Sequence, residues 1–148
     1  MMKDQYALGV DSSTSATKVI AFDAHGKTVS EGAHNYPLYA EYPGWVEQDA
    51  EDWWEALKKG CQQVVAHPSI SKNRIAGIGF THQRFTFVPV DHDLRPLRKA
   101  ILWNDLRCPK EAEYARQTVG VQKIFERTGY PPGQWTPVSY THLTLPTN

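Results

Sequence analysis

Residues 9–18 read Gly9-Val10-Asp11-Ser12-Ser13-Thr14-Ser15-Ala16-Thr17-Lys18. One apolar run, residues 6–10, leads into this stretch, and a second, residues 19–22, leads away from it. Short apolar runs bounded by turn residues are typical of buried strands. The stretch therefore predicts a strand, a tight turn and a second strand.

The predicted turn is rich in groups that bind phosphate and a divalent cation. From Asp11 to Lys18 it carries one carboxylate, five hydroxyls and one amine. Hydroxyls and turn amides donate to phosphate oxygens, Lys18 neutralises charge, and Asp11 suits a metal ion or its waters. The alternative is an ordinary hairpin whose Ser and Thr side chains bond to their own backbone. The turn alone leaves both interpretations open.

Length, charge and cysteine content narrow the class of protein. A chain of 148 residues can form one domain with a real core. Its 16 basic and 16 acidic residues cancel and are interspersed, which argues against nucleic-acid or anionic-membrane partners. The N-terminus lacks the apolar segment of an export signal, and no apolar run approaches the ~20 residues that cross a bilayer. Cys61 and Cys108 stand far apart, as in proteins of a reducing cytosol. We expect a soluble, cytoplasmic protein.

The first half of the chain predicts a meander of strands followed by a helix. A turn at residues 23–27 leads to a third extended segment from Thr28 to Tyr39, giving three antiparallel strands. Asp49 is a suitable N-cap, acidic residues follow it, and apolar residues then recur at helical spacing. We expect this helix to end near His67 and Pro68, because proline disrupts a helix.

The second half predicts shorter elements. Residues 74–80 have the pattern of a buried strand, residues 85–90 alternate like another strand, and residues 91–93 form a turn. A short apolar run covers residues 100–102. Helices are expected from Pro109 through Arg116 and from Val119 to Arg127, the second ending at Gly129.

Polar side chains follow two of these apolar segments directly. Gln83 and Arg84 follow the strand at residues 74–80, and their donors and acceptors suit polyol hydroxyls. The alternative is that Arg84 pairs with a nearby carboxylate. Trp103, Asn104 and Asp105 follow the run at residues 100–102, where an indole face can pack on a sugar and its neighbours can bond to hydroxyls.

Four blocks of the sequence together resemble the N-terminal part of the FGGY family of carbohydrate kinases, which includes xylulokinase, gluconokinase and glycerol kinase. The blocks occur in the family's order between residues 6 and 137. They are residues 9–15 with Lys18, residues 43–49 (Pro-Gly-Trp-Val-Glu-Gln-Asp), residues 77–84 (Gly-Ile-Gly-Phe-Thr-His-Gln-Arg), and residues 100–105 (Ala-Ile-Leu-Trp-Asn-Asp) with Arg107.

The resemblance implies an α/β, actin-like (ribonuclease-H-like) domain with an N-terminal antiparallel β-meander and flanking helices, here incomplete. It implies ATP-dependent phosphorylation of a sugar or polyol by in-line attack of a hydroxyl on the γ-phosphate, with ATP and Mg²⁺ bound in a cleft. Asp11 would lie near the metal. The phosphates would be bound by the turn residues and the sugar by the later blocks. The implied cofactor-binding residues are Asp11, Ser12, Ser13, Thr14, Ser15 and Lys18, and the implied substrate-binding residues are Gln83, Arg84, Trp103, Asn104 and Asp105.

Three departures from the family bear on the substrate. Ser13 stands where many members have glycine, and this occurs among xylulokinase-like members. Phe85 stands where glycerol kinases usually carry a glutamate that holds glycerol, which disfavours glycerol. Gln83 and Arg84 replace the Met-His pair of xylulokinases, although residues 103–105 look xylulokinase-like. We expect a pentulose-like substrate, while the sugar, the phosphorylated hydroxyl and the oligomeric state, including a homo-oligomer of the parent, stay open.

The chain is shorter than the family pattern requires. In the family, the aspartate that deprotonates the attacking hydroxyl lies downstream and the adenosine pocket belongs to a second domain, so we expect no catalytic base in this chain. We interpret residues 1–137 as a partial domain and residues 138–148 as a non-native or disordered tail in which His142 has no catalytic role. The fragment alone is then inactive, with at most weak sugar or phosphate binding. A third reading, an actin- or chaperone-like nucleotide-binding protein, shares the opening hairpin but leaves residues 83–84 and 103–105 unexplained.

Overall fold

The structure is a computed structural model, and it describes residues 5–133. It divides into two compact units, each described here by itself. Unit 1 comprises Met1–Leu38 and Asp49–Gln83, and unit 2 comprises Tyr39–Gln48 and Arg84–Asn148. The tail expected at residues 138–148 lies outside the described residues, as does His142.

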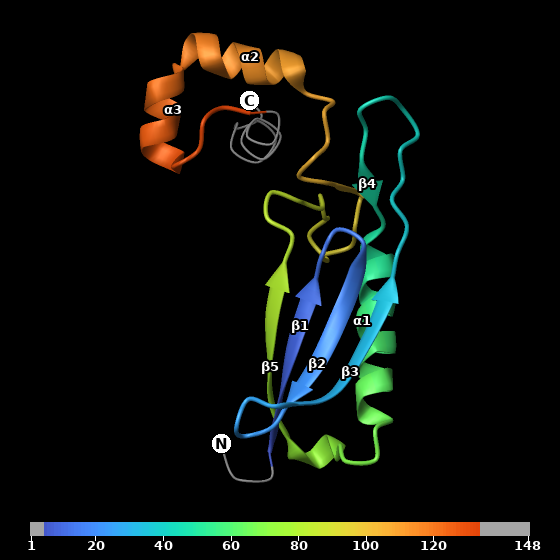
Figure 1. The fold of residues 1–148 in the computed structure, drawn as a ribbon. Helices are drawn as coiled ribbons and strands as arrows, with labels where there is room; N and C mark the ends of the chain where they lie inside the picture. The colour runs from blue at the N-terminus through green and yellow to red at the C-terminus, as the bar shows by residue number, and fades with distance from the viewer. Residues whose placement is uncertain (1–4, 134–148) are drawn as a thin grey trace. The chain divides into compact units, whose positions relative to one another are not determined.

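Unit 1 is built on a four-stranded sheet in the order β3-β2-β1-β5 (Figure 1). Its strands are β1 (Tyr6–Ser12), β2 (Ala16–Phe22), β3 (Thr28–Asn35) and β5 (Ile75–His82). β1, β2 and β3 pair antiparallel in sequence order, which confirms the predicted meander. β5 pairs parallel with β1, so the sheet is mixed. β3 ends at Asn35, short of the predicted Tyr39.

One helix, α1 (Ala50–Val65), covers β2 and β3 on one face of this sheet (Figure 1). The Asp49 side chain accepts a hydrogen bond from the backbone N–H of Glu51 at 3.0 Å, which confirms the predicted N-cap. The core lies between helix and sheet and consists of Leu8, Val10, Val19, Ala21, Val64 and Ile70. A 3-10 turn, Lys72–Arg74, leads on to β5.

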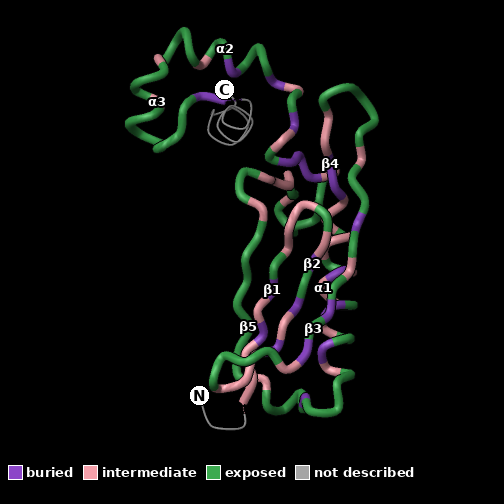
Figure 2. Tube along the Cα trace, viewed as in Figure 1, coloured by how far each residue is buried: buried purple, intermediate pink, exposed green. Residues whose placement is uncertain are grey.

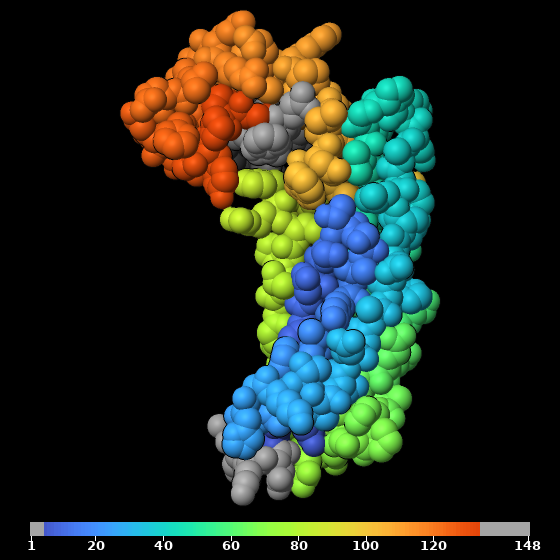
Figure 3. All heavy atoms as spheres, in the orientation of Figure 1, coloured from blue at the N-terminus to red at the C-terminus, as the bar shows by residue number. Residues whose placement is uncertain are grey.

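β5 is one of the two edge strands of the sheet, and its side chains are mostly exposed (Figure 2). Ile78 and Phe80 pair with Leu8 and Val10, so they lie on the face that α1 covers. Because α1 packs mainly on β2 and β3, these side chains are 51% and 64% exposed. The strand was correctly predicted and its burial was not. Figure 3 shows atoms of β1, β2 and β5 uncovered on the opposite face.

Up to residue 133, where the description of the chain ends, unit 2 contains a two-stranded ladder and two helices. β4 (Glu47–Gln48) pairs antiparallel with β6 (Ala100–Ile101), followed by α2 (Pro109–Thr118) and α3 (Val121–Thr128). Both helices confirm the sequence prediction to within two residues. No helix within residues 5–133 is both long and apolar enough to span a membrane.

The strand predicted at residues 85–90 is wrong. This segment makes only isolated bridges, between Phe87 and Ile101 and between Val90 and Pro96. Phe85 has a left-handed backbone with φ of 62°, and Pro89 has no N–H to donate to a ladder, so a continuous strand cannot form. The turn that follows is present, since the Asp91 carboxylate accepts from the N–H groups of Asp93 and Arg95.

Candidate functional site

The turn between β1 and β2 is held closed by its own hydroxyls. The Ser13 N–H and Oγ both donate to the Ala16 carbonyl, at 2.9 and 3.0 Å. Ser12 Oγ lies 3.1 Å from Thr17 Oγ1, which is buried. These three side chains behave as in an ordinary hairpin. Asp11, Ser15 and Lys18 are exposed, so the same turn also presents charged and hydroxyl groups to solvent.

The two charged residues of the turn are neighbours in the sheet. Asp11 and Lys18 are directly paired across β1 and β2. Lys18 Nζ also lies 3.0 Å from Glu31 Oε2, and both side chains are about half exposed or more. An exposed ion pair contributes at most about 1 kcal/mol, so Lys18 can exchange Glu31 for a phosphate at little cost.

Tyr36 braces the turn from the end of β3, a role that the sequence analysis did not assign. Its side chain is buried, and its hydroxyl lies within hydrogen-bond reach of the carbonyls of Ser13 and Ala16, the latter at 3.0 Å. Its backbone N–H donates to the Ser15 carbonyl at 3.1 Å. The only signal for this role was an amphipathic aromatic residue at the end of the predicted meander.

Gln83 braces the same turn from the other side. It follows β5 in unit 1, and its Nε2 donates to the Ser13 carbonyl at 2.8 Å. The structure therefore brings one expected polyol ligand into contact with the expected phosphate turn. The four other expected substrate residues belong to unit 2 and are Arg84, Trp103, Asn104 and Asp105.

In unit 2, Trp103 and Asn104 occupy the corner of a tight turn. The Asp105 N–H donates to the Leu102 carbonyl at 3.0 Å, which closes the turn around them. The Trp103 N–H donates to Thr86 Oγ1 at 3.2 Å, and the Trp103 side chain is 43% exposed. Arg84 Nη1 donates to the Tyr130 hydroxyl at 3.3 Å. The indole face that was expected to pack on a sugar is thus accessible within this unit.

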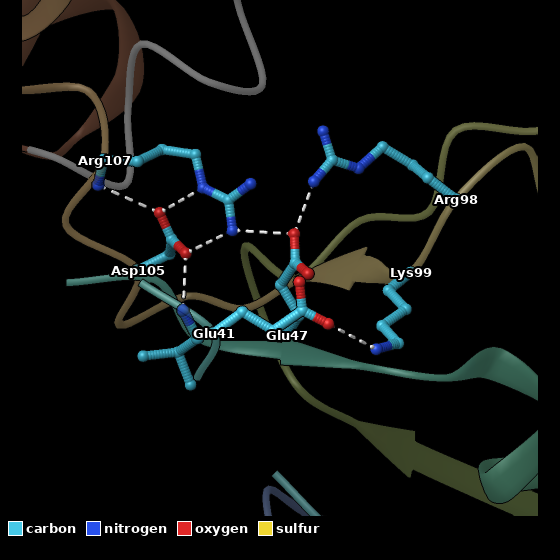
Figure 4. Close-up of polar contacts among 7 residues, drawn as sticks. Glu41, Glu47, Arg98, Lys99, Asp105 and Arg107 are labelled. Atoms are coloured by element: carbon cyan, nitrogen blue, oxygen red, sulfur yellow. Dashed lines mark hydrogen bonds and ion pairs between the residues drawn. The ribbon is translucent and has the colours of Figure 1, made fainter. Parts of the chain in front are cut away.

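Asp105 is buried, and its carboxylate is bonded within unit 2. It is only 2% exposed, and both carboxylate oxygens are bonded within the chain (Figure 4). Oδ1 accepts from the Arg107 N–H and Nε at 3.0 and 2.8 Å. Oδ2 accepts from the Val46 N–H and from Arg107 Nη2, both at 2.7 Å.

A second carboxylate completes this charged cluster. Glu47 is buried, and its Oε1 lies 2.9 Å from Arg107 Nη2 and in contact with Arg98 Nη2 (Figure 4). The Arg107 guanidinium also stacks 3.9 Å from the Trp45 ring centroid. Two buried side-chain atoms lack a hydrogen-bond partner within residues 5–133, Asn104 Oδ1 and Arg107 Nη1.

The cluster shifts the pKa values of its members. Burial alone would raise the pKa of Asp105, but the hydrogen bonds from Arg107 and the Val46 N–H, with the charge of Arg107, hold it below its usual value. Burial would likewise lower the pKa of Arg107, and its bonds to Asp105 and Glu47 raise it instead. Both groups are therefore charged at neutral pH.

We predict that Asp105 makes the folded state acid-sensitive. Because its pKa is lower folded than unfolded, its stabilising contribution is fully present above its unfolded pKa, roughly pH 4, and is lost as pH falls through the folded value. Urea unfolding measured between pH 7 and pH 2.5 gives the free energy of unfolding at each pH. This free energy should decrease less on acidification in Asp105→Asn than in the wild type. Identical pH slopes would contradict the assignment. Asp23, whose pKa is also lowered, is present in both proteins and cancels in this comparison.

The residues present suit a magnesium nucleotide better than a metal held by protein alone. Within residues 5–133, no group of three His, Cys, Asp or Glu side chains could hold a metal ion. Mg²⁺ in phosphoryl-transfer sites is typically bound by one or two carboxylates, with phosphates and waters completing its shell. The exposed Asp11, next to a hydroxyl-rich turn and Lys18, fits that pattern.

Comparison with known proteins gives one consistent result. Residues 6–143 match the model of the N-terminal domain of the FGGY family of carbohydrate kinases. A xylulose kinase from Staphylococcus epidermidis is 42% identical over 106 residues, which is 72% of this chain and 21% of the relative. A glycerol kinase from Alkalilimnicola ehrlichii is 35% identical over 127 residues, which is 84% of this chain and 26% of the relative.

A solved structure agrees with these sequence relatives. A gluconate kinase from Lactobacillus acidophilus superposes with a TM-score of 0.82 at 26% identity, over 90% of this chain and 27% of that one. The chain thus spans about a quarter of the length of the proteins it matches.

Proposed function

Since the chain belongs to the FGGY family of carbohydrate kinases, we propose that it supplies the phosphate-binding turn and the sugar-binding side chains of a longer ATP-dependent sugar or polyol kinase. The observation that carries this proposal is the hydrogen bond from Gln83 to the Ser13 carbonyl, which joins the block expected to bind the polyol to the turn expected to bind phosphate. A hairpin without a binding role would not require a hydrogen bond from the end of a distant strand.

At the phosphate side, this chain neutralises and orients the transferred group. Lys18 and the hydroxyls and amides of Thr14 and Ser15 contact phosphate oxygens, while Ser12 and Ser13, whose hydroxyls bond within the hairpin, shape the turn around them. Asp11 holds Mg²⁺ directly or through water, and the ion, when bound, neutralises charge on the phosphates. Tyr36 and Gln83 keep the turn rigid, which matters because phosphoryl transfer depends mainly on positioning.

At the sugar side, unit 2 provides an aromatic face and polar groups. The exposed face of Trp103 packs on the C–H face of the sugar. Asn104 and Arg84 bond to hydroxyls, and the Asn104 Oδ1 acceptor lacks a partner within the described residues. A pentulose-like substrate is favoured, because a xylulose kinase shares 42% identity with the chain and Phe85 replaces the glutamate expected for glycerol.

The catalytic base and the adenosine pocket belong, in this proposal, to parts of the protein beyond the present chain. Residues 1–148 alone are then catalytically inactive. We place the protein in the cytoplasm, where ATP and free sugars are available.

The function is tested by a coupled ADP-release assay on the full-length protein that carries this chain. We expect ADP release that depends on added polyol, highest with a pentulose and weaker with glycerol. Trp103→Ala should lower kcat/KM about ten- to hundredfold, since burial of a large apolar side chain against the ligand is worth about 1.5–3 kcal/mol. Asp93→Asn, at an exposed turn of unit 2, is the matched control and should behave as wild type. Silence with every polyol would overturn the proposal, and ADP release independent of polyol would favour a nucleotide-binding protein of another class.

A further inference from the structure

Two segments of unit 2 are tied together by backbone hydrogen bonds around the turn that carries Trp103. The Leu102 N–H donates to the Val46 carbonyl at 3.0 Å, and the Leu106 N–H donates to the Gly44 carbonyl at 2.7 Å. The turn from Leu102 to Asp105 lies between these two bonds. Residues 44–47 therefore lie against the turn and support it.

A charged cluster of side chains holds residues 44–47 against the turn. The Asp105 carboxylate bonds both to its own segment, through Arg107, and to the other segment, through the Val46 N–H. Arg107 in turn reaches Glu47 on the second segment at 2.9 Å. Its bonds to Asp105 form the two-pronged arrangement that fixes both distance and orientation.

The position of Asp105 leaves it no oxygen to offer a ligand. It is 2% exposed and both oxygens already accept two bonds each. At the corner of the same turn, the Trp103 side chain is 43% exposed, whereas Asn104 is half-buried and its Oδ1 has no hydrogen-bond partner within residues 5–133. The turn is therefore fixed at Asp105 and exposes the Trp103 side chain.

We propose that Asp105 is a positioning residue that, through Arg107, Val46 and Glu47, fixes the orientation of Trp103 and Asn104 toward the sugar without touching it. This rests on the proposed function for the identity of the ligand, and not for the geometry of the turn. It revises the sequence-based expectation that Asp105 contacts the polyol.

Deoxy analogues of the substrate distinguish positioning from contact. In the full-length protein, Asp105→Asn keeps the side-chain volume and removes the charge. A positioning residue should cost the same factor in kcat/KM, about ten- to hundredfold, for the preferred sugar and for each of its monodeoxy analogues. A residue that bonds to one hydroxyl should lose its penalty for the analogue lacking that hydroxyl. A vanishing penalty for one analogue, or no penalty at all, would overturn the proposal.

A second variant covers the case in which Asp105→Asn does not fold, because removing one partner of a buried ion pair can be severe. Arg107→Lys keeps the charge and leaves Asp105 intact, but a lysine cannot make the two-pronged contact. The same uniform penalty across the deoxy series is expected. In the double variant the two penalties should be far from additive, because both act through one contact; additive penalties would contradict the proposal.

Fluorine NMR of protein labelled with 5-fluorotryptophan separates this inference from the proposed function. The Trp103 signal is assigned by its loss in Trp103→Phe. Without any ligand, Asp105→Asn should shift or broaden that signal, while Asp93→Asn should leave it unchanged. A Trp103 signal identical to wild type in Asp105→Asn would overturn the positioning role. If the protein phosphorylates no polyol, the proposed function fails while this readout still decides the role of Asp105.

Discussion

Replacing Asp11 by alanine is expected to lower kcat of the full-length kinase by about a hundredfold or more while leaving the polyol KM within about threefold. The carboxylate is exposed at the end of β1 and pairs across the sheet with Lys18. In the proposed function it acts on the metal and the transferred phosphate, whose charge distribution changes in the transition state. Steady-state kinetics at saturating ATP and Mg²⁺ measure both constants.

The control for Asp11→Ala is Asp23→Asn in the next turn of the meander. The Asp23 carboxylate accepts from the N–H groups of His25 and Lys27, and an asparagine oxygen can accept the same bonds. Its kinetics should match wild type. Equal losses of kcat and of polyol affinity in Asp11→Ala would contradict the assigned role, because they would show that Asp11 supports the sugar site or the fold.

The second large effect concerns the packing of α1 on the sheet. A Cβ added at Gly32 would lie 2.5 Å from the Gly60 carbonyl oxygen and 2.7 Å from Gln63 Cβ. The first of these atoms is helix backbone and cannot move alone, so α1 must shift away from β3. We expect Gly32→Ala to lower the unfolding free energy by about 3 kcal/mol, the upper end of the usual cost of overpacking. Urea unfolding of the 148-residue chain, followed by circular dichroism, measures this loss.

A matched control exists in the same sheet. At Gly77 in β5, an added Cβ would meet no atom within 4 Å. Gly77→Ala should therefore be neutral or stabilising by up to about 1 kcal/mol, because alanine restricts the unfolded chain. If both substitutions destabilise equally, the cause lies in strand glycines generally and not in the close approach of α1 to β3.

Local patterns in the sequence predicted most of unit 1. The meander follows from alternating apolar runs and short turns, and the start of α1 follows from Asp49 and the acidic residues after it. The burial of β5 was wrongly predicted because an apolar run reports only that a strand can be buried. Whether Ile78 and Phe80 are covered depends on how far α1 extends across the sheet, which no local pattern encodes.

The sequence did not reveal the long-range contacts that support the candidate site. Tyr36 reaches the turn between β1 and β2 from 20 or more residues away, and Asp105 bonds to a backbone amide 59 positions earlier. Such contacts form only once the fold brings distant segments together. For that reason the sequence grouped Asp105 with Trp103 and Asn104 as ligands and did not reveal that the Asp105 carboxylate is buried and bonded to Arg107 and to the Val46 N–H.

The most direct test of the central claim is the product that the full-length protein forms from ATP and its best polyol. Phosphorus NMR of that reaction distinguishes a transferred phosphoryl group from a hydrolysed one. We expect ADP together with an equal amount of a sugar phosphate monoester, whose phosphorus signal couples to the protons of the esterified carbon. Inorganic phosphate as the sole product besides ADP would contradict it.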